Sequence, residues 1–177
     1  MKLKHIFLLL TLLPFSVHAK QGFTIWSDLV SRSDLIAQVS IEEVMKNSEG
    51  SGTSKVKIKK ILKGDNKTDF VFIDWKISTI QSALFNIYQD HVVFLQKNEN
   101  GKYSAAALGK SFWELEKNYT NRKLYTDSSM FSFYYIEEIP EQIYEEIEVP
   151  ATCNRNSRLI KRIYLNKLIE YFTTNKT

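Results

Sequence analysis

The sequence is poor in the residues that most often build active sites and cross-links. It has one cysteine, Cys153, and three histidines among 177 residues. A lone cysteine cannot close an intramolecular disulfide, and a zinc site usually takes three or four histidine or cysteine ligands. The chain also lacks a glycine-rich phosphate loop and the Gly-x-Ser-x-Gly elbow of serine hydrolases. We therefore expect no metal site and no cofactor.

Long apolar segments are missing as well. The longest run, residues 6–15, spans about ten residues, whereas a membrane-spanning helix needs about 20. Lys2 and Lys4 precede this run, and residues 16–19 follow it with the small side chains that a signal peptidase requires. This layout predicts a cleaved signal peptide over residues 1–19. We expect residues 20–177 to be exported to the periplasm or the extracellular space and not to be embedded in a membrane.

The excess of positive charge is small once the signal is removed. The whole chain carries 24 Lys and Arg against 20 Asp and Glu, for a net charge of +4. Loss of Lys2 and Lys4 leaves 22 basic residues against 20 acidic ones, for a net charge of +2. A nearly neutral chain gives little electrostatic reason to bind a polyanion, so we expect no nucleic-acid partner.

Most of the chain after the signal has strand patterns. Apolar and polar residues alternate, or β-branched and aromatic residues gather, and Gly- and Asn-containing turns separate the segments. The expected strands are residues 36–44, 55–62, 70–75, 91–96, 103–108 and 112–115.

The period changes toward the C-terminus. Isoleucines at positions 139, 143 and 147 predict a helix over residues 136–149, with Pro140 in its first turn. A last helix is expected from Asn154 or Ser157 through Phe172, with Leu159 facing the core. The fold class is therefore α+β and β-rich: a small OB-like β-barrel (about residues 33–117) with a helical C-terminal extension (about residues 136–173) in one domain.

The order of strands and turns resembles a known family. The quoted segments are residues 33–36, residues 55–65 with their Lys-Gly turn, residues 90–95 and residues 101–103. They resemble bacterial secreted OB-fold domains of the superfamily that holds the tissue inhibitors of metalloproteinases and the netrin-like modules. The resemblance covers about residues 33–113 and implies a barrel. Inhibitors of that family insert a disulfide-bonded N-terminal cysteine into their target, and the expected mature start at Lys20 has no cysteine, so their mechanism is not implied.

Few residues are available for catalysis. His91 is the only histidine after the signal, and nothing in the sequence brings it near Cys153. We expect His91 to be a strand-start residue at a barrel rim and Cys153 to be buried and inert. Paired carboxylates could still serve a hydrolase, since a glycosidase needs only two of them.

Two charged segments supply the candidate binding residues. The acidic stretch before Pro150 contributes Glu137, Glu138, Glu141, Glu145 and Glu146. A basic segment follows it, so these charges complement either each other or those of a partner. The lysine-rich strand contributes Lys57 and Lys59, and Trp75 is added as a candidate aromatic contact. Lysines along a strand and nearby aromatics also suit base stacking, although lysines commonly protect a sheet edge.

The sequence favours a secreted or periplasmic non-catalytic module that binds or inhibits another envelope or extracellular protein. An immunity-type protein is one form of this hypothesis. A small secreted hydrolase with paired carboxylates and an architectural envelope domain are the alternatives. The sequence does not fix the partner or the oligomeric state.

Overall fold

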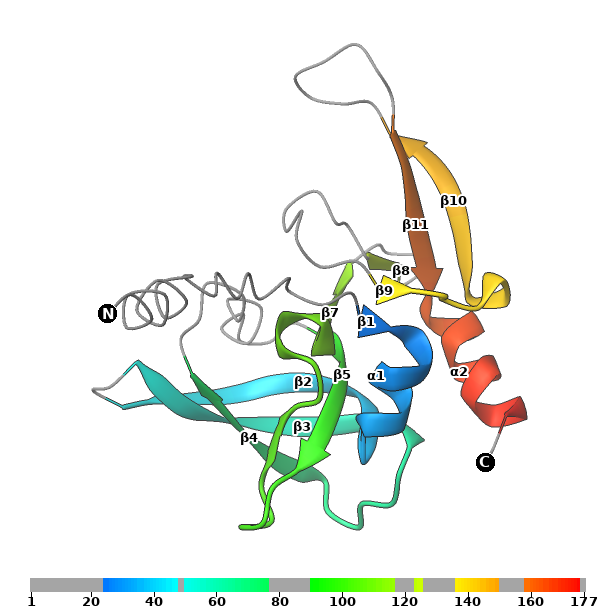
Figure 1. Ribbon diagram of the computed structural model, residues 1–177. Coiled ribbons are helices and arrows are strands. Elements are labelled where there is room, and N and C mark those ends of the chain that lie inside the picture. The colour runs from blue at the N-terminus through cyan, green and yellow to red at the C-terminus, as the bar shows by residue number, and fades with distance from the viewer. Residues whose placement is uncertain are drawn as a thin grey trace, which may run out of the picture.

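The computed structural model describes residues 24–47, 50–76, 90–116, 123–125, 136–149 and 158–175 (Figure 1). The expected signal peptide, Cys153, Tyr88, Asn154 and Ser157 lie outside these ranges. In chain order the elements are β1 (Thr24–Ile25), α1 (Trp26–Arg32), β2 (Leu35–Lys46), β3 (Ser51–Lys63), β4 (Phe70–Lys76), β5 (Asp90–Lys97), β6 (Tyr103–Ala105), the 3-10 helix η3 (Leu108–Ser111), β7 (Phe112–Glu116), β8 (Lys123–Tyr125), β9 (Ile136–Glu137), the 3-10 helix η4 (Glu141–Ile143), β10 (Tyr144–Val149), β11 (Arg158–Tyr164) and α2 (Leu165–Thr174).

Five strands close into a barrel in the order β2, β3, β4, β6, β5 and back to β2. All neighbours are antiparallel except β4 and β6, which pair in parallel at Ile73 and Tyr103. A small five-stranded barrel of this mixed kind is the OB-like architecture that the strand pattern predicts. The expected fold class is confirmed, and the predicted strands match β2 to β5 and β7 closely.

Alternation along the strands decides which side chains fill the barrel. On β4, Val71, Ile73 and Trp75 are buried, and the intervening residues face outward. Opposite faces of a strand carry alternate residues, so one apolar set per strand builds the interior. The barrel core consists of Leu35, Ala37, Val39, Ile41, Val56, Val71, Ile73, Trp75, Val93, Leu95, Tyr103 and Phe112.

Gly52 on β3 lets its backbone pass close to the Met45 carbonyl and the Trp75 ring. A Cβ atom on Gly52 would lie 2.2 Å from the Met45 carbonyl oxygen and 2.3 Å from the Trp75 ring. Any larger side chain must displace backbone or the indole, because packed interiors leave no room for such an overlap. Gly52 therefore leaves the space that the Trp75 indole occupies at this end of β3 and β4.

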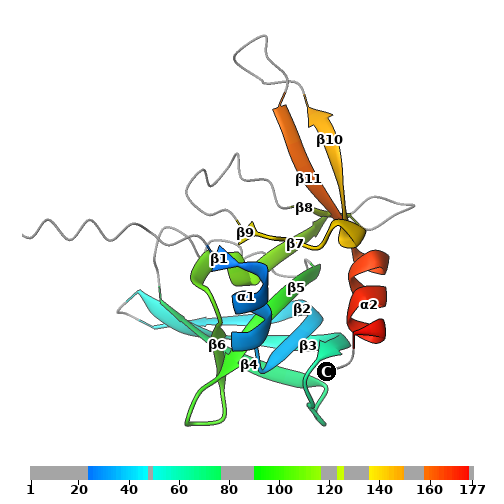
Figure 2. The ribbon, with the colours of Figure 1, turned by 45° about the vertical axis from the view of Figure 1, so that its right-hand side comes forward.

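A second core joins the barrel to the N-terminal helix and the C-terminal segment. Trp26 lies at its centre, with its ring 5.9 Å from Phe94, 5.9 Å from Trp113 and 6.0 Å from Phe172, centroid to centroid. The sheet continues from β5 through β7, β8 and β11 to β10. Both ribbon views show the β10–β11 hairpin standing away from the barrel, with α2 beneath it (Figure 2).

The C-terminal segment differs from the sequence prediction. The helix expected over residues 136–149 is wrong: this stretch forms β9, the short helix η4 and strand β10. The last helix is confirmed but begins at Leu165, and the preceding residues form β11, where Leu159 is 68% exposed. The isoleucine spacing of four reflects a turn at η4 followed by a strand, and β-branched residues favour the paired strands.

Candidate functional site

The outer face of β3 and β4 carries two exposed phenylalanines beside two lysines. Phe72 lies opposite Lys55 and Phe70 opposite Lys57 in the antiparallel register. Residues directly opposite each other in such a pair share one face of the sheet. Phe70 is 36% exposed and Phe72 is 42% exposed. These four side chains therefore form two adjacent rows on the outside of the barrel, each with one ring and one lysine.

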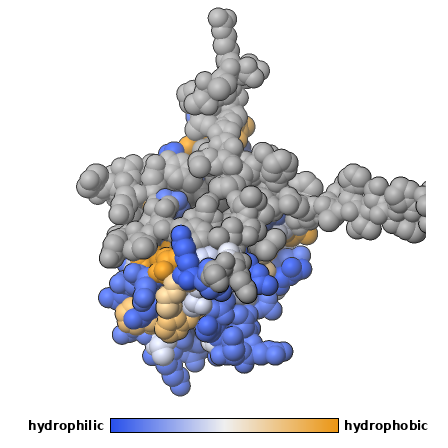
Figure 3. Space-filling view, turned by 90° about the vertical axis from the view of Figure 1, so that its left-hand side faces the viewer, coloured by the Kyte–Doolittle hydropathy of each residue, from blue (hydrophilic) through white to orange (hydrophobic). Residues whose placement is uncertain are grey.

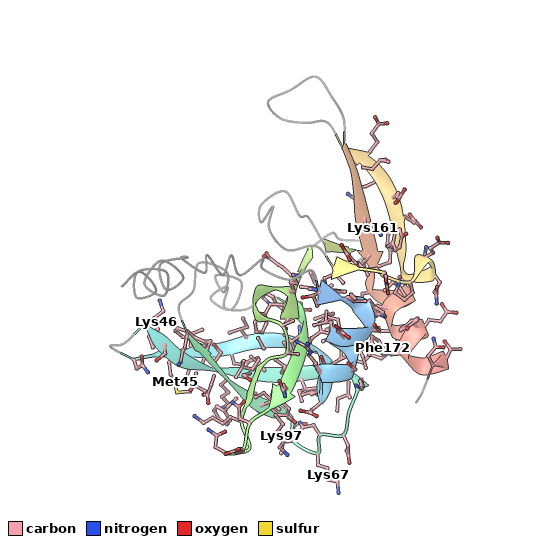
Figure 4. All side chains as sticks on the ribbon, viewed as in Figure 1. Met45, Lys46, Lys67, Lys97, Lys161 and Phe172 are labelled. Carbon is pink, nitrogen blue, oxygen red and sulfur yellow. The ribbon has the colours of Figure 1, made fainter. Side chains whose placement is uncertain are left out.

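Strand β2 extends this face with a third large apolar side chain. Met45 lies opposite Thr53, and Thr53 lies opposite Asp74 in the next row. Met45 is 40% exposed and points away from Lys46 at the end of the β2–β3 hairpin (Figure 4). Figure 3 shows apolar residues gathered within a mostly hydrophilic surface on the side where this hairpin ends. We call Met45, Lys55, Lys57, Phe70 and Phe72 the Phe–Lys face.

The lysines of this face differ in what they contact. The Nζ atom of Lys55 lies 4.5 Å from the centroid of the Phe70 ring, within the range of a cation–π contact. Lys57 is exposed, and its side chain makes no hydrogen bond or ion pair with any residue that the structure describes. The ammonium group of Lys57 is thus available to a bound molecule.

The acidic groups bordering this face are engaged by the chain itself. Asp74 accepts hydrogen bonds from the Thr53 hydroxyl at 2.6 Å and from Lys102 Nζ at 3.2 Å. Asp90, almost buried, accepts one from Lys59 Nζ and one from Gln38 Nε2 at 3.3 Å. Lys59, a predicted binding residue, therefore neutralises a largely buried carboxylate, and we interpret its role as structural.

Trp75 is not a surface residue. Its side chain is 3% exposed in the barrel core, and its indole N–H donates to the Ser54 hydroxyl at 3.0 Å. The Trp75 ring is therefore not placed to contact a partner on the barrel surface, because the opposite face of β4 is the one that meets solvent. The exposed aromatic side chains of β4 are Phe70 and Phe72, on that outer face.

The five predicted glutamates are all exposed but do not form one helical face. Glu137 lies on β9, Glu141 on η4, and Glu145 and Glu146 on β10. Glu138 follows β9 and has a backbone φ of 56°. Glu145 and Glu146 are consecutive strand residues, whose side chains point to opposite faces. They are thus poorly placed to act as a catalytic pair on one substrate.

The carboxylate of Glu145 is paired within the C-terminal segment. Glu145 accepts hydrogen bonds from the Tyr164 hydroxyl at 2.7 Å and from Lys167 Nζ at 2.9 Å. Its bond to Tyr164 is the main cause that raises the pKa of that phenol above its ordinary value. In the register of the hairpin, Glu145 and Glu146 lie opposite Arg162 and Lys161. The acidic and basic segments therefore complement each other within one chain.

Glu137 lies near a buried lysine. Lys110 is 7% exposed, and its Nζ donates to the Thr24 hydroxyl at 2.9 Å. Burial lowers the pKa of Lys110, and the charge of Glu137 partly offsets this effect. Glu137 thus stabilises the ammonium group that ties η3 to β1.

His91 lies on the same side of β5 as the barrel-core residues Val93 and Leu95 and is fully buried. His91 is the second residue of β5, which agrees with the expected strand-start position, and its burial does not suit a surface general base. Within the described ranges, no three His, Cys, Asp or Glu side chains gather where they could hold a metal ion. Nor does that part of the chain contain a helix of the length and apolarity needed to cross a membrane.

No family model matches the chain, and no curated protein has significant sequence similarity to it.

Proposed function

We propose that the chain is an exported, non-catalytic binding module that recognises another protein through the Phe–Lys face. The observation that carries this proposal is the clustering of exposed apolar side chains. Among the described residues five large hydrophobic side chains are exposed, and three of them, Met45, Phe70 and Phe72, share this one face. Isolated exposed apolar residues are ordinary, whereas grouped ones mark interaction surfaces.

The composition of the face also supports a protein partner. Aromatic residues and methionine are enriched at protein interfaces. Aromatic rings bury a large area with few rotatable bonds, whereas the flexible thioether of methionine adapts to irregular surfaces. The rings sit on strands of a closed barrel, so they are held in place before binding. β3 and β4 are the second and third strands of this barrel, and OB-folds bind oligonucleotides and oligosaccharides on the corresponding face, so ligand binding at this position has precedent in the architecture.

Export through a signal peptide and kinship with the tissue-inhibitor and netrin-like domains are parts of this proposal. The strand order of the barrel is compatible with that kinship, as it is with other OB-like barrels. An immunity-type role is one specific form of the binding module. Glu145 on β10 is a weaker candidate, because Lys167 of α2 already supplies its counter-charge.

A crosslinking pull-down tests the proposal. The bait is residues 20–177 in an envelope extract, in three forms: wild type, Phe70→Ser/Phe72→Ser, and the control Leu159→Ser. Leu159 is 68% exposed on the β10–β11 hairpin, away from the barrel. We expect a stoichiometric protein on the wild-type and Leu159→Ser baits and its loss from the double variant. Equal retention on all three baits, or no retained protein on any of them, would contradict the proposal.

A further inference from the structure

We infer that Met45 is a modification site at which oxidation to the sulfoxide weakens partner binding by the Phe–Lys face. This inference rests on the proposed function and names a regulation of that same face. It follows from the exposure of the Met45 thioether, from its distance to the two rings, and from the neighbours that it has across the sheet.

The thioether of Met45 is open to oxidants in the solvent. Met45 is 40% exposed, and its side chain points outward from the end of the β2–β3 hairpin (Figure 4). A thioether carries no ionisable proton, so its oxidation depends on access to the sulfur and not on a pKa. Exported proteins work in oxidising compartments, and export is part of the proposed function.

Hydrogen peroxide suffices as the oxidant. The Met45 sulfur attacks one peroxide oxygen, so that an S–O bond forms and the O–O bond breaks. The sulfur is oxidised by two electrons, the peroxide is reduced, and the second oxygen leaves as water with both protons. A dithiol-dependent reductase reverses the change, because its two thiols become a disulfide while the sulfoxide oxygen leaves as water.

Met45 lies close enough to the rings to share one interface with them. It is two strands away from Phe72 and one row further along the sheet, which is roughly 12 Å by ordinary strand spacings. An ordinary protein interface covers about 800 Å² on each partner. A partner seated on the rings therefore also covers Met45 and removes its thioether from water.

A sulfoxide at position 45 finds its polar neighbours already engaged. The Thr53 hydroxyl, opposite Met45, donates to Asp74 at 2.6 Å. The ammonium group of Lys55 lies 4.5 Å from the centroid of the Phe70 ring. A partner matched to an apolar thioether offers no donor in their place, so binding strips water from the sulfoxide oxygen without replacing its hydrogen bonds. Burying a polar group in this way weakens binding.

Peroxide treatment of the pull-down bait tests the inference, with the envelope extract as the probe. The baits are residues 20–177 as wild type, Met45→Leu and Met45→Gln. Leucine keeps the apolar surface without the sulfur, and glutamine imitates the polarity of the sulfoxide. Peptide mass spectrometry locates the added oxygen, and circular dichroism verifies that each bait is folded. Oxidised Met45→Leu also controls for Met130 and Cys153, the other sulfur-bearing residues of the bait.

We expect oxidation to lower capture by the wild-type bait about tenfold, since the loss of one buried apolar contact is of this order. Methionine sulfoxide reductases with dithiothreitol should restore capture. Met45→Gln should show a similar loss without peroxide, and Met45→Leu should capture the protein equally before and after treatment.

Three results would overturn the inference: unchanged capture by a wild-type bait whose Met45 is fully oxidised, an equal loss from oxidised Met45→Leu, or a Met45 that peroxide leaves unmodified. Failure of the proposed function gives a different result. In that case Phe70→Ser/Phe72→Ser keeps the captured protein without any oxidation, or no bait captures one, and the inference fails with it. If the double variant loses the protein while oxidation of Met45 changes nothing, the face binds a protein but is not regulated at Met45.

Discussion

Replacing Trp26 with alanine should weaken the packing between the barrel and the C-terminal segment and so lower the free energy of unfolding. The indole is 4% exposed and contacts rings from β5, β7 and α2. Its Nε1 also lies 3.4 Å from the Tyr171 hydroxyl, and the two rings meet edge to face. Removing a buried tryptophan side chain costs about 3–5 kcal/mol, because transfer free energy is lost and a cavity remains. Such a loss is a large part of the roughly 5–15 kcal/mol that stabilises an ordinary domain.

Urea unfolding of residues 20–177, followed by far-ultraviolet circular dichroism, measures this effect. With a slope of about 2 kcal/mol per molar, the midpoint should fall by about 1.5–2.5 M. Leu159→Ala is the control, and this exposed substitution should change the unfolding free energy by less than about 0.5 kcal/mol. A loss below about 1 kcal/mol for Trp26→Ala would refute the view that this indole is the centre of the second core.

Three further substitutions test other parts of the structure. Lys59→Met should lower the unfolding free energy by about 1–3 kcal/mol, because it removes the ammonium group that pairs with the Asp90 carboxylate. The control Lys57→Met should change the unfolding free energy by less than about 0.5 kcal/mol. Equal effects of the two substitutions in urea unfolding would contradict the structural role of Lys59. Gly52→Ala should cost about 1–3 kcal/mol or more, since the new methyl group overlaps the Met45 carbonyl and the Trp75 ring, and an unchanged melting temperature would show that the wall is not packed as described. Tyr103→Phe tests a titration. Burial, and to a lesser extent the charge of Asp34, raises the pKa of the Tyr103 phenol above its ordinary value of 10.0. The unfolded chain therefore loses this proton at lower pH than the folded chain, so wild-type stability should fall above pH 10.0 relative to the variant. A constant difference in unfolding free energy from pH 8 to 11 would contradict this assignment.

The barrel could be predicted from the sequence because its strands carry their own signal. Alternation in β3 and the turn at Gly64 depend on local residues, and a strand buried on one face must show this period. Gly64 has a φ of 94°, in the region that favours glycine, and a Cβ there would lie 2.1 Å from the Asp34 carbonyl oxygen. The order β2–β3–β4 then follows from the short connections at residues 47–50 and 64–69, whereas β5 closes the barrel by pairing with β2.

The C-terminal segment could not be predicted in the same way. The spacing of Ile139, Ile143 and Ile147 fits a helix as well as a turn followed by a strand. Pairing with β11 decides between these two structures. In the β10–β11 register, Glu145 and Glu146 lie opposite Arg162 and Lys161, which follow them by more than ten residues in the sequence. Long-range pairing of this kind overrides local periodicity and leaves no local signal.

The candidate site was predicted only in part, for a related reason. Both faces of β4 are rich in aromatic and apolar residues, so the sequence alone does not show which face points inward. The structure places Trp75 inside and Phe70 and Phe72 outside. Lys57 was a predicted binding residue and remains one, whereas Lys59 lies close enough to Asp90 to be held by it.

Site-specific photocrosslinking tests the central claim most directly. A benzoylphenylalanine residue replaces Phe72 on the Phe–Lys face or, in a separate variant, Leu159 on the β10–β11 hairpin, and the full chain is irradiated in cells before the envelope is extracted. We predict one discrete crosslinked protein from position 72 and none from position 159. A crosslinked partner from position 159 alone, or none from either position, would contradict the claim that this chain binds a protein through the outer face of β3 and β4.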